Sequence, residues 1–282
     1  MIQIIAENEQ GLRWNLSKEK DVQLIKVTGL TPPVATIYSH SLPTSDGDKY
    51  NRSRTEKRNI VLIFAPSVSP ENGRMKIYNI FKIKRYIKLY FKTKNRDVYT
   101  EGYIETIDGD LFENPQKIQI SIICHYPYFK QKDDVITSFT TVNSFFEFPF
   151  AIEEEGIEFS ESVSMVEKKI YNDSDNEVGI IIELEAVGRC LEPTIYNRST
   201  GKSFSFKADL FTGDRVVINT NPGQKSIKLY HEGVESNIIN NIHFGSKWLD
   251  LQVGENIFTY TCAEGVDNLR MSFKTNLAYG GL

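Results

Sequence analysis

Short segments in which apolar and polar residues alternate recur along the whole chain, and this period of two predicts β-strands. Over residues 1–30, Ile2 and Ile4, and later Trp14 and Leu16, alternate with polar or small neighbours. Further strands with this pattern are expected over residues 59–64, 86–92, 98–107 and 117–124. The first half of the chain is therefore predicted to be mainly β-structure.

One segment of the first half has a helical pattern instead. Ser69-Pro70-Glu71-Asn72 has the composition of a helix N-terminus, because proline is tolerated in the first turn. Beyond it, Met75, Tyr78 and either Phe81 or Ile80 fall on one helical face. The sequence therefore predicts a short helix that packs against the core through this face.

Residues 31–59 interrupt the strands with a polar stretch. It opens with Thr31-Pro-Pro33 and continues with many Ser, Thr, Asp, Asn, Lys and Arg residues, among them Thr44-Ser-Asp-Gly-Asp48. Low hydrophobicity and turn residues favour a long exposed loop or an extended hairpin. Long loops in compact domains are usually functional or mobile, so this segment is a candidate for function.

From about residue 145 onward the pattern consists of strands and turns with almost no helical signal. Strands are expected over residues 145–150, 178–186, 193–197, 203–206, 215–219, 226–230, 248–251 and 257–262. Ser199-Thr-Gly201 and Asn221-Pro-Gly223 have the composition of hairpin turns. Many short strands at this spacing indicate a β-sandwich or a barrel.

Length and composition are those of a globular protein with two domains. The chain has 282 residues, of which 40% are hydrophobic and 25% charged, enough to bury a substantial core. The polar run Lys130–Asp134 follows the last strand of the first half, and the composition then turns acidic. We therefore expect a mainly β chain with an N-terminal domain over residues 1–135 and a C-terminal domain over residues 136–270.

Charge is distributed unevenly along the chain. Residues 48–98 hold 14 Lys and Arg against 4 Asp and Glu, a net charge of +10, whereas residues 99–192 hold 6 against 20, a net charge of −14. Such blocks are either two solvated faces or surfaces that meet within one chain or between copies. A nucleic-acid site would need a compact basic patch or a known motif, and the sequence contains neither.

The cysteines and the N-terminus suggest where the protein folds. Cys124, Cys190 and Cys262 are far apart and odd in number, which favours free thiols in a reducing cytoplasm over a disulfide framework. The N-terminal residues lack the basic and apolar regions of a signal peptide. No apolar run approaches the roughly 20 residues that span a bilayer, so no membrane partner is expected.

The histidines and carboxylates do not form a pattern typical of catalysis or metal binding. None of the four histidines has metal-ligand spacing to another His or Cys, and His231-Glu232 matches only the start of a zinc-protease motif. Asp173-Ser-Asp-Asn-Glu177 resembles a calcium loop but has Val178 where that motif has glycine, so a polar turn is the better interpretation. Asp108 and Asp110 lie in a tight turn.

Motifs for nucleophilic or phosphate chemistry are also absent from the sequence. It has no Gly-x-Ser-x-Gly elbow, no phosphate-binding glycine loop and no Cys-x-x-Cys. We therefore predict that the protein is not an enzyme and has no catalytic, metal or cofactor site. Trp248, beside Lys247 and Asp250, is a candidate for stacking on a sugar; the alternative is that it packs in the core beside Leu249 or Leu251.

An ordered set of strand-and-turn phrases from about residue 20 onward resembles the distal tail protein (Dit) family of long-tailed bacteriophages. No single phrase is specific, but the order of the set is. The phrases lie at 47–54, 58–62, 75–81, 89–92, 95–105, 111–129, 178–180, 193–197, 213–220 and 254–260, and include Gly47-Asp-Lys-Tyr-Asn51, Asn95-Arg-Asp-Val-Tyr99, Leu111-Phe-Glu-Asn-Pro115 and Gly254-Glu-Asn256.

The resemblance implies a structural role. It implies a ring-forming N-terminal β domain, split-barrel-like with a short helix, and a C-terminal galectin-like β-sandwich. Copies would form a hexameric hub ring that joins the tail tube to the tail tip or baseplate, with DNA only passing through the central channel. The expected location is the virion tail, after assembly in the host cytoplasm. In some members the end of the chain returns to the first domain, which here would be roughly Met271–Leu282.

A cyclic ring needs one surface of each copy to dock on a different surface of the next. The polar 31–59 segment, with Arg52, Arg54, Lys57 and Arg58, is therefore our candidate for inter-subunit contact. The alternative function is a carbohydrate-binding adhesion module that acts through the second domain and Trp248. A third possibility, an enzyme acting on cell-wall polymer, has no motif in its favour.

Overall fold

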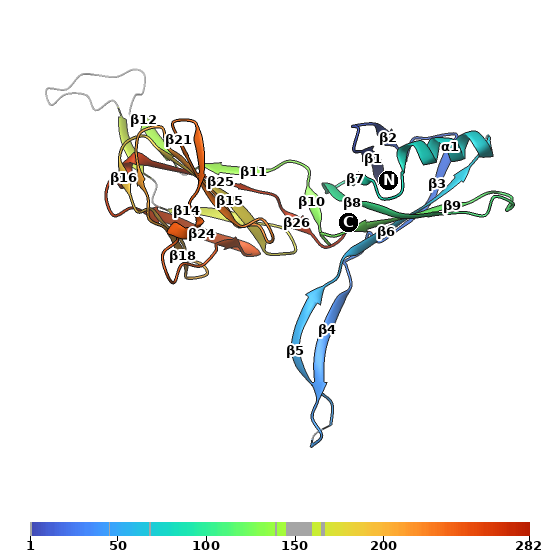
Figure 1. The fold of residues 1–282 in the computed structure, drawn as a ribbon, viewed down its shortest axis with the longest axis horizontal. Helices are drawn as coiled ribbons and strands as arrows, with labels where there is room; N and C mark the ends of the chain where they lie inside the picture. Colours follow the sequence, from blue (N-terminus) through green and yellow to red (C-terminus); the bar gives the residue numbers. More distant parts are fainter. Residues whose placement is uncertain (1, 45, 68, 139, 145–159, 165–166) are drawn as a thin grey trace. The chain divides into compact units, whose positions relative to one another are not determined.

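The computed structural model describes residues 2–44, 46–67, 69–138, 140–144, 160–164 and 167–282. They form two compact units, Met1–Lys132 with Ala278–Leu282 (unit 1) and Asp133–Leu277 (unit 2) (Figure 1). The expected domain ranges, 1–135 for a ring-forming domain and 136–270 for a galectin-like sandwich, stay predictions. Among the described residues, no helix is both long and apolar enough to cross a membrane.

Unit 1 is a large antiparallel sheet with one helix and a separate hairpin. Its elements are β1 (Gln3–Asn8), β2 (Arg13–Asn15), β3 (Val22–Thr28), β4 (Ala35–Ser41), β5 (Asp48–Thr55), β6 (Arg58–Pro66), α1 (Pro70–Ile80), β7 (Tyr86–Lys92), β8 (Asp97–Asp108), β9 (Ile118–Cys124), β10 (Phe129–Gln131) and β26 (Ala278–Tyr279). The strand order is β2-β1-β7-β8-β9-β6-β3, and β10 pairs with both β8 and β26.

Alternation of side chains explains why these segments form a sheet with one buried face. In β6 the side chains of Ile60, Leu62 and Phe64 are fully buried, and their neighbours point the other way. At the edge of this core, the rings of Trp14, Phe64 and Phe81 pack together with centroids 5.8–6.2 Å apart.

The helix begins at Pro70 as predicted, and Ile80 and Phe81 of the predicted face are buried, but Met75 and Tyr78 are not. Its buried residues are Gly73, Ile77 and Ile80, whereas Met75 and Tyr78 are 48% and 38% exposed. The cause is Gly73: a Cβ built there would lie 2.8 Å from Cβ of Pro66 and 3.2 Å from Cγ2 of Val22. Because glycine has no side chain, the helix turns this position toward the sheet.

Unit 2 is a β-sandwich. Its elements are β11 (Val135–Ser138), β12 (Thr140–Ser144), β13 (Ser160–Ser164), β14 (Glu167–Asn172), β15 (Val178–Ala186), β16 (Cys190–Leu191), β17 (Thr194–Asn197), β18 (Lys202–Ser205), β19 (Asp209–Leu210), β20 (Arg215–Asn219), β21 (Ser226–His231), β22 (Val234–Asn237), η1 (Ile239–Asn241), β23 (Asp250–Leu251), β24 (Gly254–Thr261), η2 (Val266–Asn268) and β25 (Leu269–Thr275). The two main sheets have the orders β11-β25-β15-β20-β21-β22 and β14-β24-β17-β18.

Alternating apolar side chains form the core between these sheets. One of the sheets contributes β15, in which the side chains of Ile180, Ile182 and Leu184 are buried. The rings of Phe258 in β24 and Phe273 in β25 meet edge to face, with centroids 4.6 Å apart. Sheet-on-sheet packing through such residues is the usual way in which a sandwich buries its apolar faces.

The sequence predicted most of these elements. The mainly β fold class is confirmed, as are the strand Val178–Ala186, the hairpin turns at 199–201 and 221–223, and the extended-hairpin alternative for residues 31–59. The strand predicted over 248–251 is shorter, Asp250–Leu251. The strand predicted over 145–150 lies outside the described residues.

Substitution of Gly73 by alanine tests the close approach of α1. Alanine would gain about 1 kcal/mol of helix propensity, but its Cβ would overlap Pro66, so we expect a net loss of about 1–3 kcal/mol in the free energy of unfolding. Urea unfolding measures it. Asn79→Ala, at an exposed position of the same helix, is the control and should be neutral or slightly stabilising; a Gly73→Ala protein as stable as the wild type would refute the packing argument.

Candidate assembly surface

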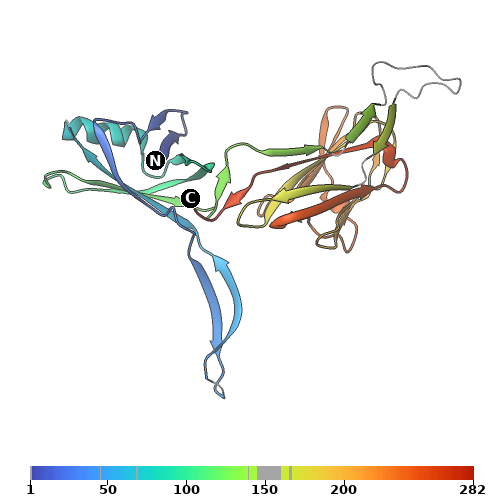
Figure 2. The ribbon, with the colours of Figure 1, turned by 180° about the vertical axis from the view of Figure 1, so that it is seen from behind.

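Strands β4 and β5 form a hairpin that pairs with no other described strand, and we call residues 35–55 the arm. Its register runs from Ala35 opposite Thr55 to Ser41 opposite Asp48, with an irregularity after Tyr38. Figures 1 and 2 show the arm extending away from the sheet of unit 1. Because the arm is a lone strand pair, both of its outer edges carry unpaired backbone groups.

The arm exposes more apolar surface than a solvated loop needs. Ile37 is 67% exposed and Tyr50 60% exposed, and Val34 just before β4 is 76% exposed. Exposed apolar groups beside unpaired strand edges mark a place where another chain can bind.

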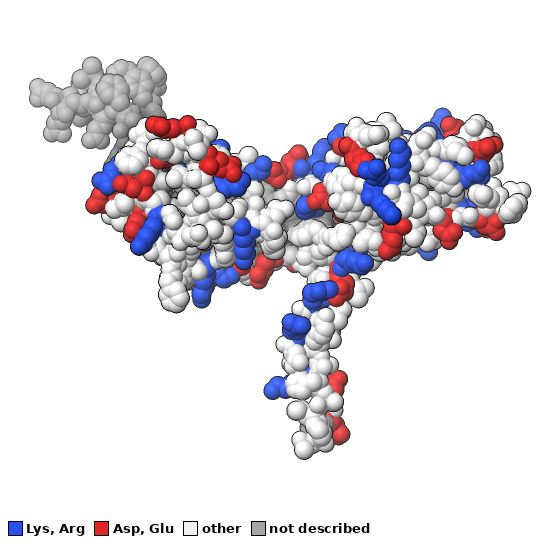
Figure 3. Space-filling view, in the orientation of Figure 1, with Lys and Arg blue, Asp and Glu red and all other residues white. Residues whose placement is uncertain are grey.

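One face of the arm combines Tyr38 with arginines. The register places Tyr38 opposite Arg52 and Thr36 opposite Arg54, and the guanidinium of Arg52 lies 4.9 Å from the centre of the Tyr38 ring. Arg54 instead forms an ion pair with Glu56, 2.9 Å apart. Basic side chains follow one another along the arm in Figure 3. This face is suited to an acidic or polar partner surface.

The arm is joined to the sheet through a buried arginine. Arg58, at the start of β6, is only 3% exposed. Its guanidinium donates hydrogen bonds to the main-chain oxygens of Pro127 (2.6 Å), Thr31 (2.8 Å), Gly280 (2.5 Å) and Gly29. It also lies 4.2 Å from the centre of the Phe129 ring. Burial lowers the pKa of Arg58, yet an arginine stays charged at physiological pH.

The acceptors of Arg58 come from three separate parts of the chain. Gly29 and Thr31 precede β4, Pro127 precedes β10, and Gly280 follows β26. No described carboxylate forms an ion pair with Arg58, so the four carbonyl dipoles and the ring face compensate its charge. Arg58 therefore fixes the foot of the arm to the sheet and to the end of the chain.

The segment Ala278–Leu282 completes unit 1. β26 pairs with β10, and the amide of Leu282 donates to the carbonyl of Leu30 at 3.1 Å. Arg96 donates to the carbonyl of Gly281 and lies 4.5 Å from the centre of the Tyr279 ring. Of the predicted returning segment Met271–Leu282, residues up to Leu277 belong to unit 2, where β25 pairs with β15.

These positions separate the four residues predicted for inter-subunit contact. Arg52 and Arg54 lie on the arm, and Lys57 lies between the arm and β6. Arg58 is occupied inside its own unit, at odds with the prediction that it faces a neighbouring copy. The sequence grouped it with the others because it is adjacent to them and charged, and no local signal revealed its distant carbonyl partners.

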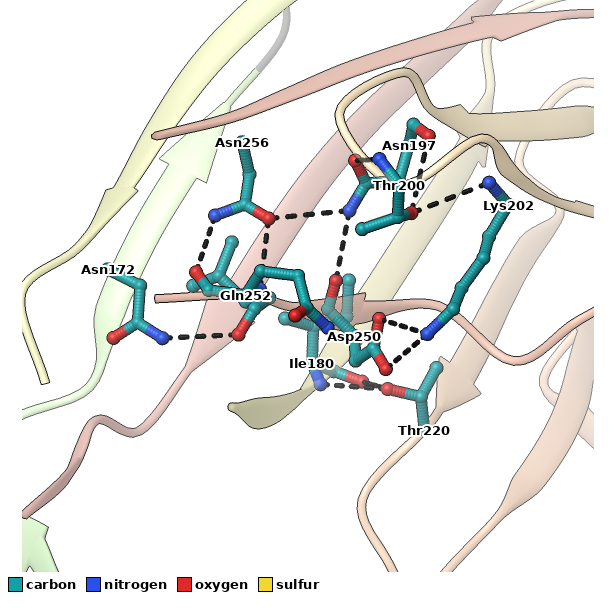
Figure 4. Close-up of polar contacts among 10 residues, drawn as sticks. Asn172, Ile180, Asn197, Thr200, Lys202, Thr220, Asp250, Gln252 and Asn256 are labelled. Carbon is teal, nitrogen blue, oxygen red and sulfur yellow. Dashed lines mark hydrogen bonds and ion pairs between the residues drawn. The ribbon is translucent and has the colours of Figure 1, made fainter. Parts of the chain in front are cut away.

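Unit 2 has a buried polar network that is hydrogen-bonded to residues 250–252, the segment shortly after Trp248. Asn172, Asn197 and Asn256 are fully buried, and their amide nitrogens donate to the main-chain oxygens of Leu251 (3.1 Å), Asp250 (3.0 Å) and Gln252 (2.7 Å). Lys202 pairs with the Asp250 carboxylate at 2.6 Å (Figure 4). Because buried amides must be hydrogen-bonded, this network holds residues 250–252 in one conformation.

Trp248 is half-buried next to this network. Its ring centroid lies 5.0 Å from that of the buried Phe204, and the Lys225 ammonium lies 5.5 Å from the ring centre. Trp248 thus packs on a core phenylalanine, and these contacts do not test whether it also binds a sugar.

The other candidates for chemistry lie in turns. Asp173–Glu177 connects β14 to β15, and Asp108 ends β8 with Gly109 and Asp110 directly after it. His231 ends β21, where its Nδ1 lies 2.6 Å from Oδ1 of the buried Asp214. This hydrogen bond and the charge of Asp214 raise the pKa of His231. Among the described residues, no three His, Cys, Asp or Glu side chains are placed to hold a metal ion.

Comparison with known proteins relates both the second unit and the whole fold to phage tails. Residues 173–276 match the family model for the siphovirus-type tail component, C-terminal domain. The solved Dit protein (gp 19.1) of phage SPP1, described as a paradigm of hub adsorption apparatus in phages that infect Gram-positive hosts, has 12% sequence identity, a TM-score of 0.68 and 99% coverage of both chains.

Two structures of the phage P2 baseplate in its activated conformation also resemble the chain. The one with Ca has 11% identity and a TM-score of 0.53, the one with Sr has 12% identity and a TM-score of 0.51, and all of both chains is covered in each case. At these identities the likeness establishes the fold. No curated protein matches the chain by sequence.

Removal of the Arg58 charge should destabilise unit 1. Arg58→Met keeps a long side chain but leaves buried carbonyl groups without donors, so we expect the free energy of unfolding to fall by roughly 3 kcal/mol or more. Arg52→Met, on the exposed arm, is the matched control and should change it by less than about 1 kcal/mol. Equal effects of the two substitutions in urea unfolding would contradict the anchoring role.

The contact between His231 and Asp214 predicts a pH dependence of stability. Because its pKa is raised in the folded state, the contribution of His231 is complete below its unfolded value of 6.5 and is lost as pH rises through the higher folded value. NMR titration should give a His231 midpoint above 6.5, and His231→Gln should flatten the stability profile in that window. A midpoint at or below 6.5 would show that the contact does not form.

Proposed function

We propose that the chain is a siphovirus-type tail component of the distal tail (Dit) family and that copies of it close into a hexameric hub ring. The ring joins the tail tube to the baseplate or host-recognition apparatus, and DNA passes through its centre. This assigns the protein to the virion tail, after assembly in the host cytoplasm, with a structural rather than a catalytic role.

The observation that carries the proposal is the anchored arm. A flexible segment would lose much conformational entropy on docking, whereas a hairpin fixed at its foot by Arg58 is already ordered. Its exposed face with Tyr38, Arg52 and Arg54 belongs to a hairpin that pairs with no other strand among the described residues. We infer that this face docks on a different surface of the next copy, the heterologous contact that a ring requires.

Charge supports the same arrangement. Arg52 and Arg54 belong to the basic block 48–98, and the acidic block 99–192 offers a complementary surface on a neighbour. Part of that acidic block, residues 145–159, lies outside the described residues. Complementary blocks favour the ordered docking of copies over random association, because like surfaces repel each other.

Deletion of the arm tests the proposal. In the variant, residues 37–53 are replaced by Asn-Gly, which joins Thr36 to Arg54 by a hairpin turn and leaves Arg58 in place. We expect native mass spectrometry and negative-stain microscopy to show rings for the full chain and monomers for the variant. Rings from both proteins would exclude a role for the arm, and monomers from the full chain at high concentration would exclude a self-assembling ring.

A charge-reversal pair refines the result. Arg52→Glu with Arg54→Glu should raise the protein concentration needed for ring formation at least tenfold, because two attractive contacts per interface become repulsive. Lys207→Glu with Lys247→Glu makes the same change of charge at exposed positions of unit 2 and serves as the control. If the two double variants assemble alike, net charge rather than the arm determines assembly.

A further inference from the structure

Two of the three cysteines lie on neighbouring segments of unit 2. Cys190 begins β16 and is fully buried, and Cys262 directly follows β24 and is partly exposed. The amide of Ala263 donates to the carbonyl of Leu191 at 2.8 Å, and the amide of Leu191 donates to that of Glu264 at 3.0 Å. The residues that flank the two cysteines are thus hydrogen-bonded to each other.

Further contacts hold these segments close together. Asn268 Nδ2 donates to the carbonyl of Arg189 at 2.9 Å. Gly265 has a φ of +75°, and a Cβ built there would lie 2.1 Å from the same carbonyl oxygen. On its other side β16 pairs with β19, with Cys190 opposite Leu210. Cys190 therefore has little freedom to move away from residues 262–268.

The electrostatics of the two thiols agree with this proximity. Their mutual hydrogen bond lowers the pKa of Cys190 and raises the pKa of Cys262. Cys124 differs from them, since it lies in β9 of unit 1, is fully buried, and has its pKa raised by burial. The chain thus contains one thiol pair and one separate thiol, which provides an internal control.

We propose that Cys190 and Cys262 are a modification site at which a small disulfide oxidant of the glutathione class forms an intramolecular disulfide. Transfer of the Cys262 proton to the Cys190 thiolate leaves a thiolate on the accessible Cys262, which attacks one sulfur of the reagent and gives a mixed disulfide and one free small thiol. The Cys190 thiolate then attacks the Cys262 sulfur, closes the protein disulfide and releases the second small thiol. The two protein thiols lose two electrons and two protons, and the reagent is reduced to two thiols.

The disulfide would give the sandwich a covalent link between β16 and the end of β24. It would close the loop between residues 190 and 262. A cross-link of this kind restricts the unfolded chain and thereby stabilises the native fold. In a reducing compartment the pair stays as thiols, and in an oxidising medium it closes. The inference concerns unit 2 alone and does not depend on ring formation.

The test compares the full chain after incubation with oxidised glutathione and after incubation with a dithiol reductant. We expect the number of titratable thiols under denaturing conditions to fall from three to one, the intact mass to fall by two hydrogen atoms, and peptide mapping to link Cys190 to Cys262. The midpoint of thermal unfolding should rise by on the order of 10 °C.

Serine variants serve as controls. Cys124→Ser should behave as the wild type, whereas Cys190→Ser and Cys262→Ser should form no internal link. Three free thiols after oxidation, a link that involves Cys124, or a persistent glutathione adduct on Cys262 would each overturn the proposal. If a serine variant at 190 or 262 does not fold, thiol counting and mapping of the wild type and of Cys124→Ser still decide the question.

Discussion

The organisation of unit 1 depends on one buried cation, the guanidinium of Arg58. It is surrounded by carbonyl oxygens rather than by a carboxylate, and these oxygens belong to three separate segments of the chain. A planar group with five fixed donors can satisfy several carbonyls at once, which a lysine at this position could not do. The segment that leads into the arm, the connection into β10 and residues 278–282 are therefore joined by the same side chain.

The two units stabilise their irregular segments by the same physical means. In unit 1 a charged side chain donates hydrogen bonds to main-chain oxygens. In unit 2 the neutral amides of the buried Asn172, Asn197 and Asn256 do the same. Buried polar groups of this kind are costly unless every donor finds an acceptor, so each network allows one backbone arrangement and penalises others. A protein that functions through its surfaces benefits from such rigidity, because a docking surface must keep its shape before the partner arrives.

Local patterns determine how much of this structure a sequence can reveal. Alternation from Val178 to Ala186 identified β15, because one face of the strand is buried and the other is more exposed. The glycines at 201 and 223 identified hairpin turns, because both have the positive φ that glycine adopts readily. The orientation of α1 was only partly predictable by hydrophobicity. Ile77 and Ile80 mark its buried face, but Gly73 carries no hydrophobic signal and its close contact with Pro66 depends on the tertiary fold. Arg58 shows the same limit, because its role comes from carbonyl groups distant in sequence, and carbonyl groups are the same in every residue type.

The placement of residues 278–282 in unit 1 has a consequence for biosynthesis. The whole of unit 2 is inserted, in chain order, between β10 and β26 of unit 1. A ribosome must therefore synthesise the entire sandwich before the strand that completes the first sheet emerges, and Arg58 lacks the acceptor at Gly280 until then. Translation thus imposes an order on maturation: a nascent chain has its arm, Arg58 and three of the acceptor carbonyls before it has the fourth, at Gly280.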